Sequence, residues 1–381
     1  MISALSENEI DPFEQYICQG EPLQRAKGYA WKTAIGLQAV DGLQTSPYLH
    51  QTACSHIEGD ITIGEAQDRI RSYYESREQR LAAAPGTEEA DKVAANIAQI
   101  LNEQTLSFSV SGLLSVHRRL FRGVFNHAGK LRQVNLTKSE PVLRGDTVRY
   151  VSYVDLEPTI SYDLSQEKKF NYAGLSREQI VTHLVQFVSN LWQIHPFREG
   201  NTRTTAVFTI LYLRSLGFEV ENDLFAAHSW YFRNALVRAN YQNVAKGIER
   251  DTSYLEKFFR NLLLGENHEL KNRYMIVSSS LMAGEEDQLI PQTIQVPYKL
   301  HTSNADEAYP EQELLRALHV QVMGVKQLME RLGLRNRPHF LTRYITPALE
   351  KGLIVPLYPE SPRHPRQKYR LTDKGRAALM F

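Results

Sequence analysis

The sequence of 381 residues has little of what defines several special protein classes. Its only cysteines are Cys18 and Cys54, which excludes a disulfide framework and a cysteine-rich zinc site. The longest apolar run, residues 206–213, is far shorter than the ~20 residues that a membrane-spanning helix needs. Acidic residues near the amino terminus replace the basic and apolar segments of a signal peptide, so we expect a cytoplasmic protein with no membrane partner.

A strong net charge is also absent, because the formal charge at pH 7 is +1. This value hides an asymmetry: residues 316–381 hold 13 Lys and Arg against 4 Asp and Glu, and the rest of the chain is acidic. The basic tail is therefore the segment to test for an anionic partner. Hydrophobic residues at 42% and charged residues at 23% indicate folded domains, and the length favours two or three of them.

Helical patterns dominate the first 283 residues. Thr62 and Glu65 have the spacing of a capping box and predict a helix through Tyr74. Apolar residues recur at helical spacing in residues 177–194, and Pro196 limits that helix at its carboxyl end. Residues 204–216 are apolar nearly all round, which is typical of a helix buried in the middle of a bundle.

One segment carries a β signal. Residues 131–136 and 147–153 are rich in β-branched and aromatic residues, and Gly145 and Asp146 suit the turn between them. This pattern predicts an isolated β-hairpin in an otherwise helical region.

The carboxyl-terminal part begins after a proline-containing polar stretch, residues 284–310, that we interpret as a linker. The patterns that follow predict helices at residues 314–320, 324–332 and 338–351, strands at 353–357 and 367–371, and a last helix from Asp373. This order matches a winged helix-turn-helix.

The most informative segment is the loop that runs from His195 to Thr204, with the sequence HPFREGNTRT. Gly200 allows the backbone to approach a ligand, and the free N–H groups of the helix that follows favour an anion. Glu199 is a hard oxygen ligand suited to Mg²⁺, and Arg203 offers donors for phosphate oxygens. We interpret the loop as a diphosphate site.

His195 adds a base to this site, because an imidazole with an ordinary pKa of ~6.5 can deprotonate a hydroxyl that attacks phosphorus. The structural alternative is that His195 only ends a helix and Arg203 only pairs with Glu199. Several compatible groups within nine positions favour the functional interpretation.

The loop resembles the signature of the Fic family, His-any-Phe-any-Asp/Glu-Gly-Asn-Gly-Arg-any-any-Arg. The matching residues are His195, Phe197, Glu199, Gly200, Asn201 and Arg203. The resemblance, over residues 100–265, implies an all-α Fic-type bundle with a small β-hairpin flap. It also implies transfer of AMP from ATP, with Mg²⁺, to a Ser, Thr or Tyr hydroxyl of a target protein.

The resemblance further implies roles for individual residues. His195 would be the catalytic base, Glu199 the metal ligand, and Gly200, Asn201, Thr202 and Arg203 the phosphate-binding residues. The nearest matches to the residues that frame the nucleoside are Tyr231 and Asn240, with core packing an equal alternative for Tyr231.

The predicted hairpin would be the family's flap, which holds a target segment by strand addition. Lys138, Glu140 and Arg149 lie on it and are the candidate target-binding residues, although surface solvation would explain each of them alone.

Two positions depart from the signature. Thr202 replaces a glycine, and Ala206 stands where a second arginine would contact the γ-phosphate. The kinase-like Doc branch also lacks that arginine, so phosphoryl transfer to a protein is an alternative, although Doc has a lysine at the position of Thr202. A second alternative, of a different class, is a DNA-binding regulator whose loop senses a nucleotide without catalysis.

Many Fic proteins carry a helix with Ser/Thr-any-any-any-Glu-Gly/Asn whose glutamate inhibits the site. Residues 54–59 place Glu58 in such a motif with cysteine at its first position, and residues 37–42 place Asp41 in one with leucine there. Both carboxylates are therefore candidates for an inhibitory residue.

We thus expect an antitoxin-like helical lead at residues 1–85, a Fic catalytic domain at 86–283, the linker at 284–310 and a winged helix-turn-helix domain at 311–381. The candidate DNA-binding residues of the tail are Arg335, Arg337, Arg343, Arg363, Arg366 and Lys368. Protein contacts are the alternative role of that domain, and a homodimer is the alternative to a monomer.

Overall fold

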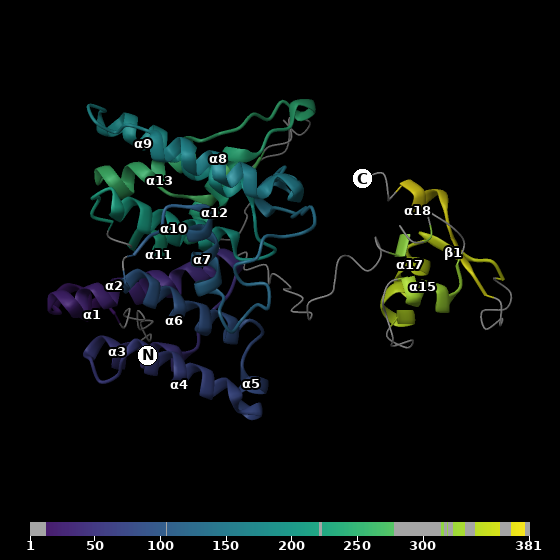
Figure 1. The fold of residues 1–381 in the computed structure, drawn as a ribbon, viewed down its shortest axis with the longest axis horizontal. Helices are drawn as coiled ribbons and strands as arrows, with labels where there is room; N and C mark the ends of the chain where they lie inside the picture. Colours follow the sequence, from purple (N-terminus) through teal and green to yellow (C-terminus); the bar gives the residue numbers. More distant parts are fainter. Residues whose placement is uncertain are drawn as a thin grey trace, which may run out of the picture. The chain divides into compact units, whose positions relative to one another are not determined.

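The computed structural model describes residues 13–103, 105–220, 223–277, 314, 315, 318, 323–331, 340–358 and 367–377. It divides into two compact units, residues 1–299 and 300–381, and this division falls within the stretch that we interpret as a linker. Each unit is described by itself below (Figure 1).

The amino-terminal unit is helical. Its helices are α1 Glu14–Gln19, α2 Pro22–Gly36, η1 Leu37–Asp41, α3 Pro47–Glu58, α4 Ile63–Glu75, α5 Arg77–Ala82, α6 Thr87–Glu103, α7 Val110–Leu120, η2 Pro141–Leu143, η3 Tyr153–Asp155, α8 Leu156–Lys169, α9 Arg177–Ile194, α10 Asn201–Ser215, α11 Asp223–Ala227, α12 Ser229–Asn240, η4 Val244–Lys246, α13 Ser253–Leu264 and η5 Asn272–Met275. None of the helices in the described part of the chain combines the length and apolar character that crossing a bilayer requires.

Helix α10 lies in the middle of this unit, with α9 and α13 on one side and α2 and α6 on the other (Figure 1). All its residues from Asn201 to Leu213 are buried, as its apolar sequence predicts. The capping box predicted at Thr62 is present, because the Thr62 N–H donates to Glu65 Oε2 at 2.7 Å and the Glu65 N–H donates to Thr62 Oγ1 at 3.2 Å.

The described part of the lead, from residue 13 on, shares one hydrophobic core with the residues that follow it. Helix α2 packs against α6 and α11. Its last residue, Gly36, approaches so closely that a Cβ there would lie 2.5 Å from the Ala226 backbone, and the Ser229 hydroxyl donates to the Gly36 carbonyl at 2.8 Å. The lead is therefore docked against the helices that surround α10.

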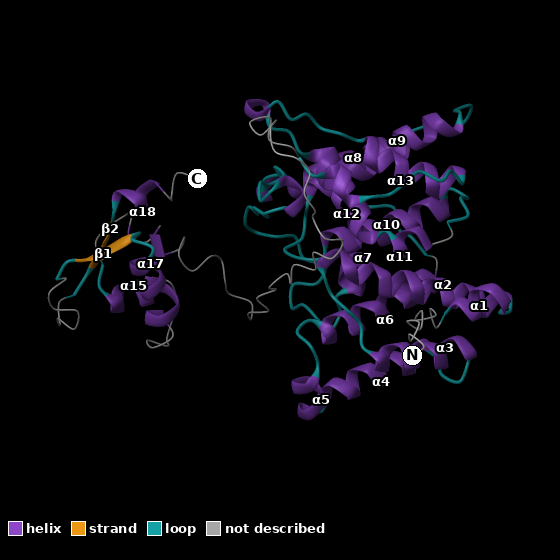
Figure 2. Ribbon diagram, turned by 180° about the vertical axis from the view of Figure 1, so that it is seen from behind, coloured by secondary structure: helices purple, strands orange, loops and turns teal. Residues whose placement is uncertain are grey.

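The prediction of strands in residues 131–153 is wrong, because these residues form extended loops around a turn and contain no strand (Figure 2). The turn itself is present, with the Glu140 N–H donating to the Asp146 carbonyl at 2.9 Å. The physical reason lies in Arg132, whose guanidinium donates to the carbonyls of Val134 and Val151. These bonds join the two arms through a side chain instead of through the paired backbone N–H and C=O groups of a strand ladder.

The carboxyl-terminal unit contains α15 Val325–Arg331, the π-helical turn η6 Leu341–Ile345, α17 Thr346–Glu350, β1 Ile354–Pro356, β2 Tyr369–Leu371 and α18 Asp373–Ala377. The two strands pair antiparallel, with Ile354 opposite Leu371. Elements therefore occur at most of the predicted positions, and this unit has its own apolar core. The linker lies outside the described residues.

Candidate functional site

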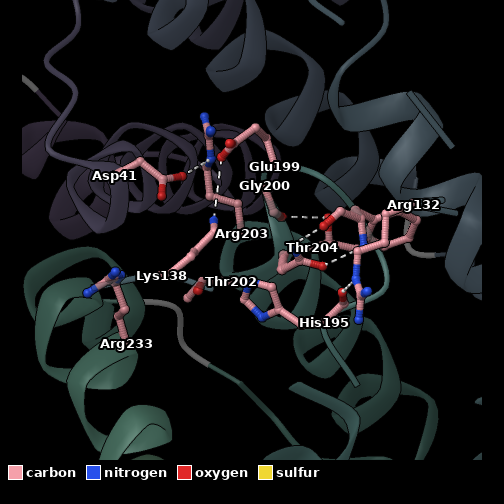
Figure 3. A network of polar contacts seen from close by, with 12 residues as sticks. Asp41, Arg132, Lys138, His195, Glu199, Gly200, Thr202, Arg203, Thr204 and Arg233 are labelled. Atoms are coloured by element: carbon pink, nitrogen blue, oxygen red, sulfur yellow. Dashed lines mark hydrogen bonds and ion pairs between the residues drawn. The ribbon is translucent and has the colours of Figure 1, made fainter. Parts of the chain in front are cut away.

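The predicted loop connects α9 to α10 and begins at His195, which ends α9 in the left-handed region with φ 50°. Arg132 fixes this conformation, because its Nε donates to the His195 carbonyl at 2.8 Å (Figure 3). The Tyr150 ring stacks on the imidazole with centroids 4.0 Å apart. His195 is 2% exposed, and neither ring nitrogen has a hydrogen-bond partner among the described residues.

Burial, assisted by the nearby charge of Lys138, holds the pKa of His195 well below its ordinary value. The imidazole is therefore neutral at neutral pH. A neutral ring with unused nitrogens can accept a proton once a substrate hydroxyl reaches it.

The middle of the loop depends on a glycine. Gly200 has φ 72°, and a Cβ at this position would lie 2.1 Å from Cζ of Phe121. The Asn201 side chain bonds the loop to itself, because it accepts from the Phe197 N–H at 2.9 Å and donates to the Phe197 carbonyl at 2.7 Å. Asn201 therefore shapes the loop through its side chain.

His117 on α7 also supports the loop, and no motif of the sequence indicates this role. The Gly129 N–H donates to its Nδ1 at 2.7 Å, so the neutral ring carries its proton on Nε2, which donates to the Glu199 carbonyl at 3.1 Å. The ring also stacks on Phe197 with centroids 3.7 Å apart. Burial lowers the pKa of His117 to about 3.

Arg203 is 2% exposed, and its guanidinium points toward Asp41 of the lead (Figure 3). Its Nε lies 2.7 Å from Oδ2 of Asp41, its Nη2 donates to Oε1 of Glu89 at 2.7 Å, and its Nη1 donates to Oε1 of Gln38 at 3.0 Å. Burial alone would lower the pKa of Arg203, but the two carboxylates raise it above its ordinary value. This guanidinium is thus charged and occupied by protein groups.

Glu199 is partly exposed, and its Oε2 lies 3.5 Å from Nζ of Lys138. Within the described residues, no group of three or more His, Cys, Asp or Glu side chains gathers to hold a metal ion. A single accessible carboxylate fits Mg²⁺ that takes its remaining ligands from water and from substrate phosphates.

A small cavity of about 10 Å³ lies where these groups meet. Its lining includes the side chains or backbone of Asp41, Lys138, Glu140, Trp192, His195, Gly200, Asn201, Thr202 and Arg233. This volume holds about one water molecule. The site is therefore closed in this structure.

Two flap residues differ in their surroundings. Glu140 is buried and its Oε2 lies 2.7 Å from Nη2 of Arg233 on α12, whereas Arg149 is exposed. Lys138 is only half-buried and faces the cavity beside Glu199.

The structure leaves the nucleoside candidates outside the cavity. Tyr231 is buried and donates to the Tyr254 carbonyl at 3.1 Å. The Asn240 amide donates to Ser189 and Leu236, and so holds α12 against α9. Thr202, by contrast, lines the cavity, and its hydroxyl accepts from Trp192 Nε1 at 3.0 Å.

The other candidates lie elsewhere. Glu58 is exposed and accepts from the Tyr16 hydroxyl, away from the loop. In the tail, Lys368 is exposed beside β2. Arg335, Arg337, Arg363 and Arg366 lie outside the described residues, as does the side chain of Arg343.

Residues 107–213 match the model of the Fic/DOC family. The chain carries a Fic domain. Residues 311–372 match a second model, described as the C-terminal domain of filamentation induced by cAMP protein Fic-like. The resemblance seen in the loop is therefore confirmed.

Relatives of this chain include the protein adenylyltransferase VbhT of Bartonella schoenbuchensis, 29% identical over 30% of this chain and 23% of that protein. A probable protein adenylyltransferase Fic of Salmonella typhimurium is 27% identical over 31% of this chain and 56% of its own. The chain thus matches about a quarter to a half of the length of these relatives. A solved Fic family protein from Desulfovibrio desulfuricans is 20% identical, with a TM-score of 0.42 over 95% of this chain and 90% of that one.

Proposed function

We propose that this Fic protein transfers AMP from ATP to a hydroxyl side chain of a target protein, and that its helical lead holds the site closed. The observation that carries the proposal is that the His195 imidazole, with both nitrogens unused, lines the same cavity as the Gly200–Thr202 end of α10. One base and one anion-binding helix end at a single cavity are what nucleotidyl transfer needs.

In the proposed reaction His195 accepts the proton of the target hydroxyl as that oxygen attacks the α-phosphorus. The new bond joins the hydroxyl oxygen to phosphorus, the bond between the α-phosphorus and the bridging oxygen breaks, and pyrophosphate leaves. Arg132 and Tyr150 hold the imidazole in position throughout. The neutral state of His195 suits this role.

The amides at the start of α10 and the Arg203 guanidinium would bind the phosphates. Glu199 would hold Mg²⁺, which supplies charge stabilisation to the phosphate oxygens. Lys138 would yield the Glu199 carboxylate to the metal, because an ion pair between partly exposed side chains is weak.

The closed state supports inhibition by Asp41 rather than Glu58. Asp41 occupies Arg203, whereas Glu58 lies away from the loop. Glu89 on α6 contributes a second carboxylate to the same guanidinium. An open site therefore requires that η1 move away from α10.

Mass spectrometry after incubation with ATP and Mg²⁺ tests the proposal, with the Asp41→Asn variant to open the site. An added AMP on the chain or on a target is the expected result, and His195→Ala should abolish it. An added phosphate would instead support the kinase alternative. No adduct despite nucleotide binding would support the nucleotide-sensing regulator.

The tail unit suits a DNA partner, because its described elements follow the order of a winged helix and Lys368 and Arg370 are exposed at its β2 strand. Titration of duplex DNA at increasing salt tests this part. Affinity that falls steeply with salt is expected, and a flat response would favour protein contacts.

A further inference from the structure

Where the family signature has its second arginine, this chain has Ala206, which is fully buried within α10. A guanidinium from another element, that of Arg233 on α12, lines the cavity. We infer that Arg233 is a phosphate-binding residue of the nucleotide site, and that Glu140 holds it in place until the nucleotide binds. This inference rests on the proposed nucleotide-dependent function.

The first support is the state of the Arg233 side chain. It is 9% exposed, its Nη2 is paired with Glu140, and its guanidinium carbon lies 5.1 Å from the centroid of the Trp230 ring. Its Nη1 is buried without a hydrogen-bond partner among the described residues. A buried N–H without an acceptor is unfavourable, and a phosphate oxygen would supply the missing acceptor.

The second support is its position relative to the loop. Arg233 shares the cavity with the backbone of Gly200 and with Thr202, which form the anion-binding end of α10. Arg233 also lies on the rigid helix α12, so its guanidinium is held before the ligand arrives (Figure 3).

The third support is the balance of charge. Two buried arginines of the site are held by carboxylates from a segment other than their own: Arg203 by Asp41 and Glu89, and Arg233 by Glu140. A polyphosphate that enters after η1 moves would replace such carboxylates with its own oxygens. The same guanidinium would then pass from a protein anion to a substrate anion.

Calorimetric titration with ATP and Mg²⁺ tests the inference in the Asp41→Asn background. Arg233→Met should weaken ATP binding at least about ten-fold, which corresponds to about 1.4 kcal/mol. Arg238→Met is the matched control, because Arg238 lies on the same helix with the same 11% side-chain exposure but does not line the cavity. Equal ATP affinity in the Arg233→Met and Arg238→Met variants would overturn the inference. If Arg233→Met fails to fold, Arg233→Lys takes its place, with an expected loss of ATP affinity between those of the parent chain and the methionine variant.

The Glu140→Gln variant distinguishes two roles of Arg233: binding the phosphates of ATP, and neutralising the buried charge of Glu140. If Arg233 binds phosphate, adding Arg233→Met to the Glu140→Gln variant still weakens ATP binding at least about ten-fold. Recovery of affinity in the double variant would overturn the inference. AMP transfer that does not depend on Arg233 would overturn the inference but leave the proposed function intact. ATP binding without AMP transfer would overturn the proposed function alone. A lack of ATP binding in the Asp41→Asn background would overturn both.

Discussion

Asp41 Oδ2 lies 2.7 Å from Nε of Arg203, and this ion pair joins the amino-terminal lead to the nucleotide-binding loop. The two residues are 162 positions apart in the sequence, yet both belong to helices that meet at the same cavity. Because Arg203 is enclosed, the pair is screened little by water. The phosphate-binding arginine is thus unavailable until this contact breaks.

Asp41→Asn should therefore increase AMP transfer. Loss of one carboxylate weakens the docking of η1, and coupling energies of this kind change activity by about 5-fold to about 150-fold. The measurement is incorporation of labelled AMP. Glu58→Gln is the control and should leave the rate of AMP transfer unchanged, because Glu58 contacts Tyr16 and not the loop. Activation by Glu58→Gln and not by Asp41→Asn would make Glu58 the inhibitory residue instead of Asp41.

Gly36→Leu should open the site without any change in charge. A Cβ at Gly36 meets the Ala226 backbone at 2.5 Å, so α2 must withdraw from α11 and carry η1 with it. We expect faster AMP transfer together with a loss of about 1–3 kcal/mol in the free energy of unfolding. Gly28→Ala on the same helix is the control, because the nearest atom there, at 3.3 Å, belongs to the Ile17 side chain. Destabilisation without activation would show that docking of α2 does not close the site.

The sequence predicted the elements that depend on local signals. Residues 177–194 were predicted as a helix from apolar spacing and Pro196, and α9 spans Arg177–Ile194. Helix α8 was missed, because its residues carry a weak apolar pattern with a proline in the first turn.

What the sequence could not predict depends on contacts between distant segments. Arg132 bridges the two predicted arms by donating to a carbonyl of each, and nothing in the sequence of those arms reveals this contact. Two similar motifs made Asp41 and Glu58 equal candidates, and only the docking of the lead distinguishes them. The sequence alone does not identify the role of His117, because a single histidine on a helix can have many roles. Its contact with the Glu199 carbonyl depends on the fold.

Gly200→Ala should destabilise the chain through two separable effects. A left-handed backbone costs a non-glycine residue about 1–2 kcal/mol, and the new Cβ also overlaps Phe121. Phe121→Leu should relieve only the overlap, so a double-mutant cycle in urea should give a coupling free energy of at least about 0.5 kcal/mol. Additive losses would mean that Phe121 moves aside without cost.

His117→Phe should reduce AMP transfer while the ring stack on Phe197 is kept. The substitution leaves the Gly129 N–H and the Glu199 carbonyl without their partner, and each buried orphan costs about 1–3 kcal/mol. We expect a lower kcat with a smaller change in ATP affinity, because the loop that carries Glu199 loses its support. His228→Phe is the control outside the site, and equal loss in both variants would contradict the positioning role.

Stability should decrease as the pH falls below about 6.5, because several histidines are buried as neutral rings. Burial, with help from Lys27, lowers the pKa of His56 to about 4. The unfolded chain binds the proton first, so the stabilisation is complete above pH 6.5 and is lost progressively from there down to about pH 4, at up to about 1.4 kcal/mol per pH unit.

His56→Gln isolates this contribution, since the Gln carbonyl can still accept from Trp31 Nε1, which donates to His56 Nδ1 at 3.0 Å. Urea unfolding between pH 7.5 and 5.5 should show a shallower pH slope in the variant than in the parent chain. Buried carboxylates such as Asp91, whose pKa burial raises, titrate identically in both proteins and cancel in the comparison. Identical slopes would mean that His56 is protonated in the folded chain and that the lead tolerates a charge beneath Trp31.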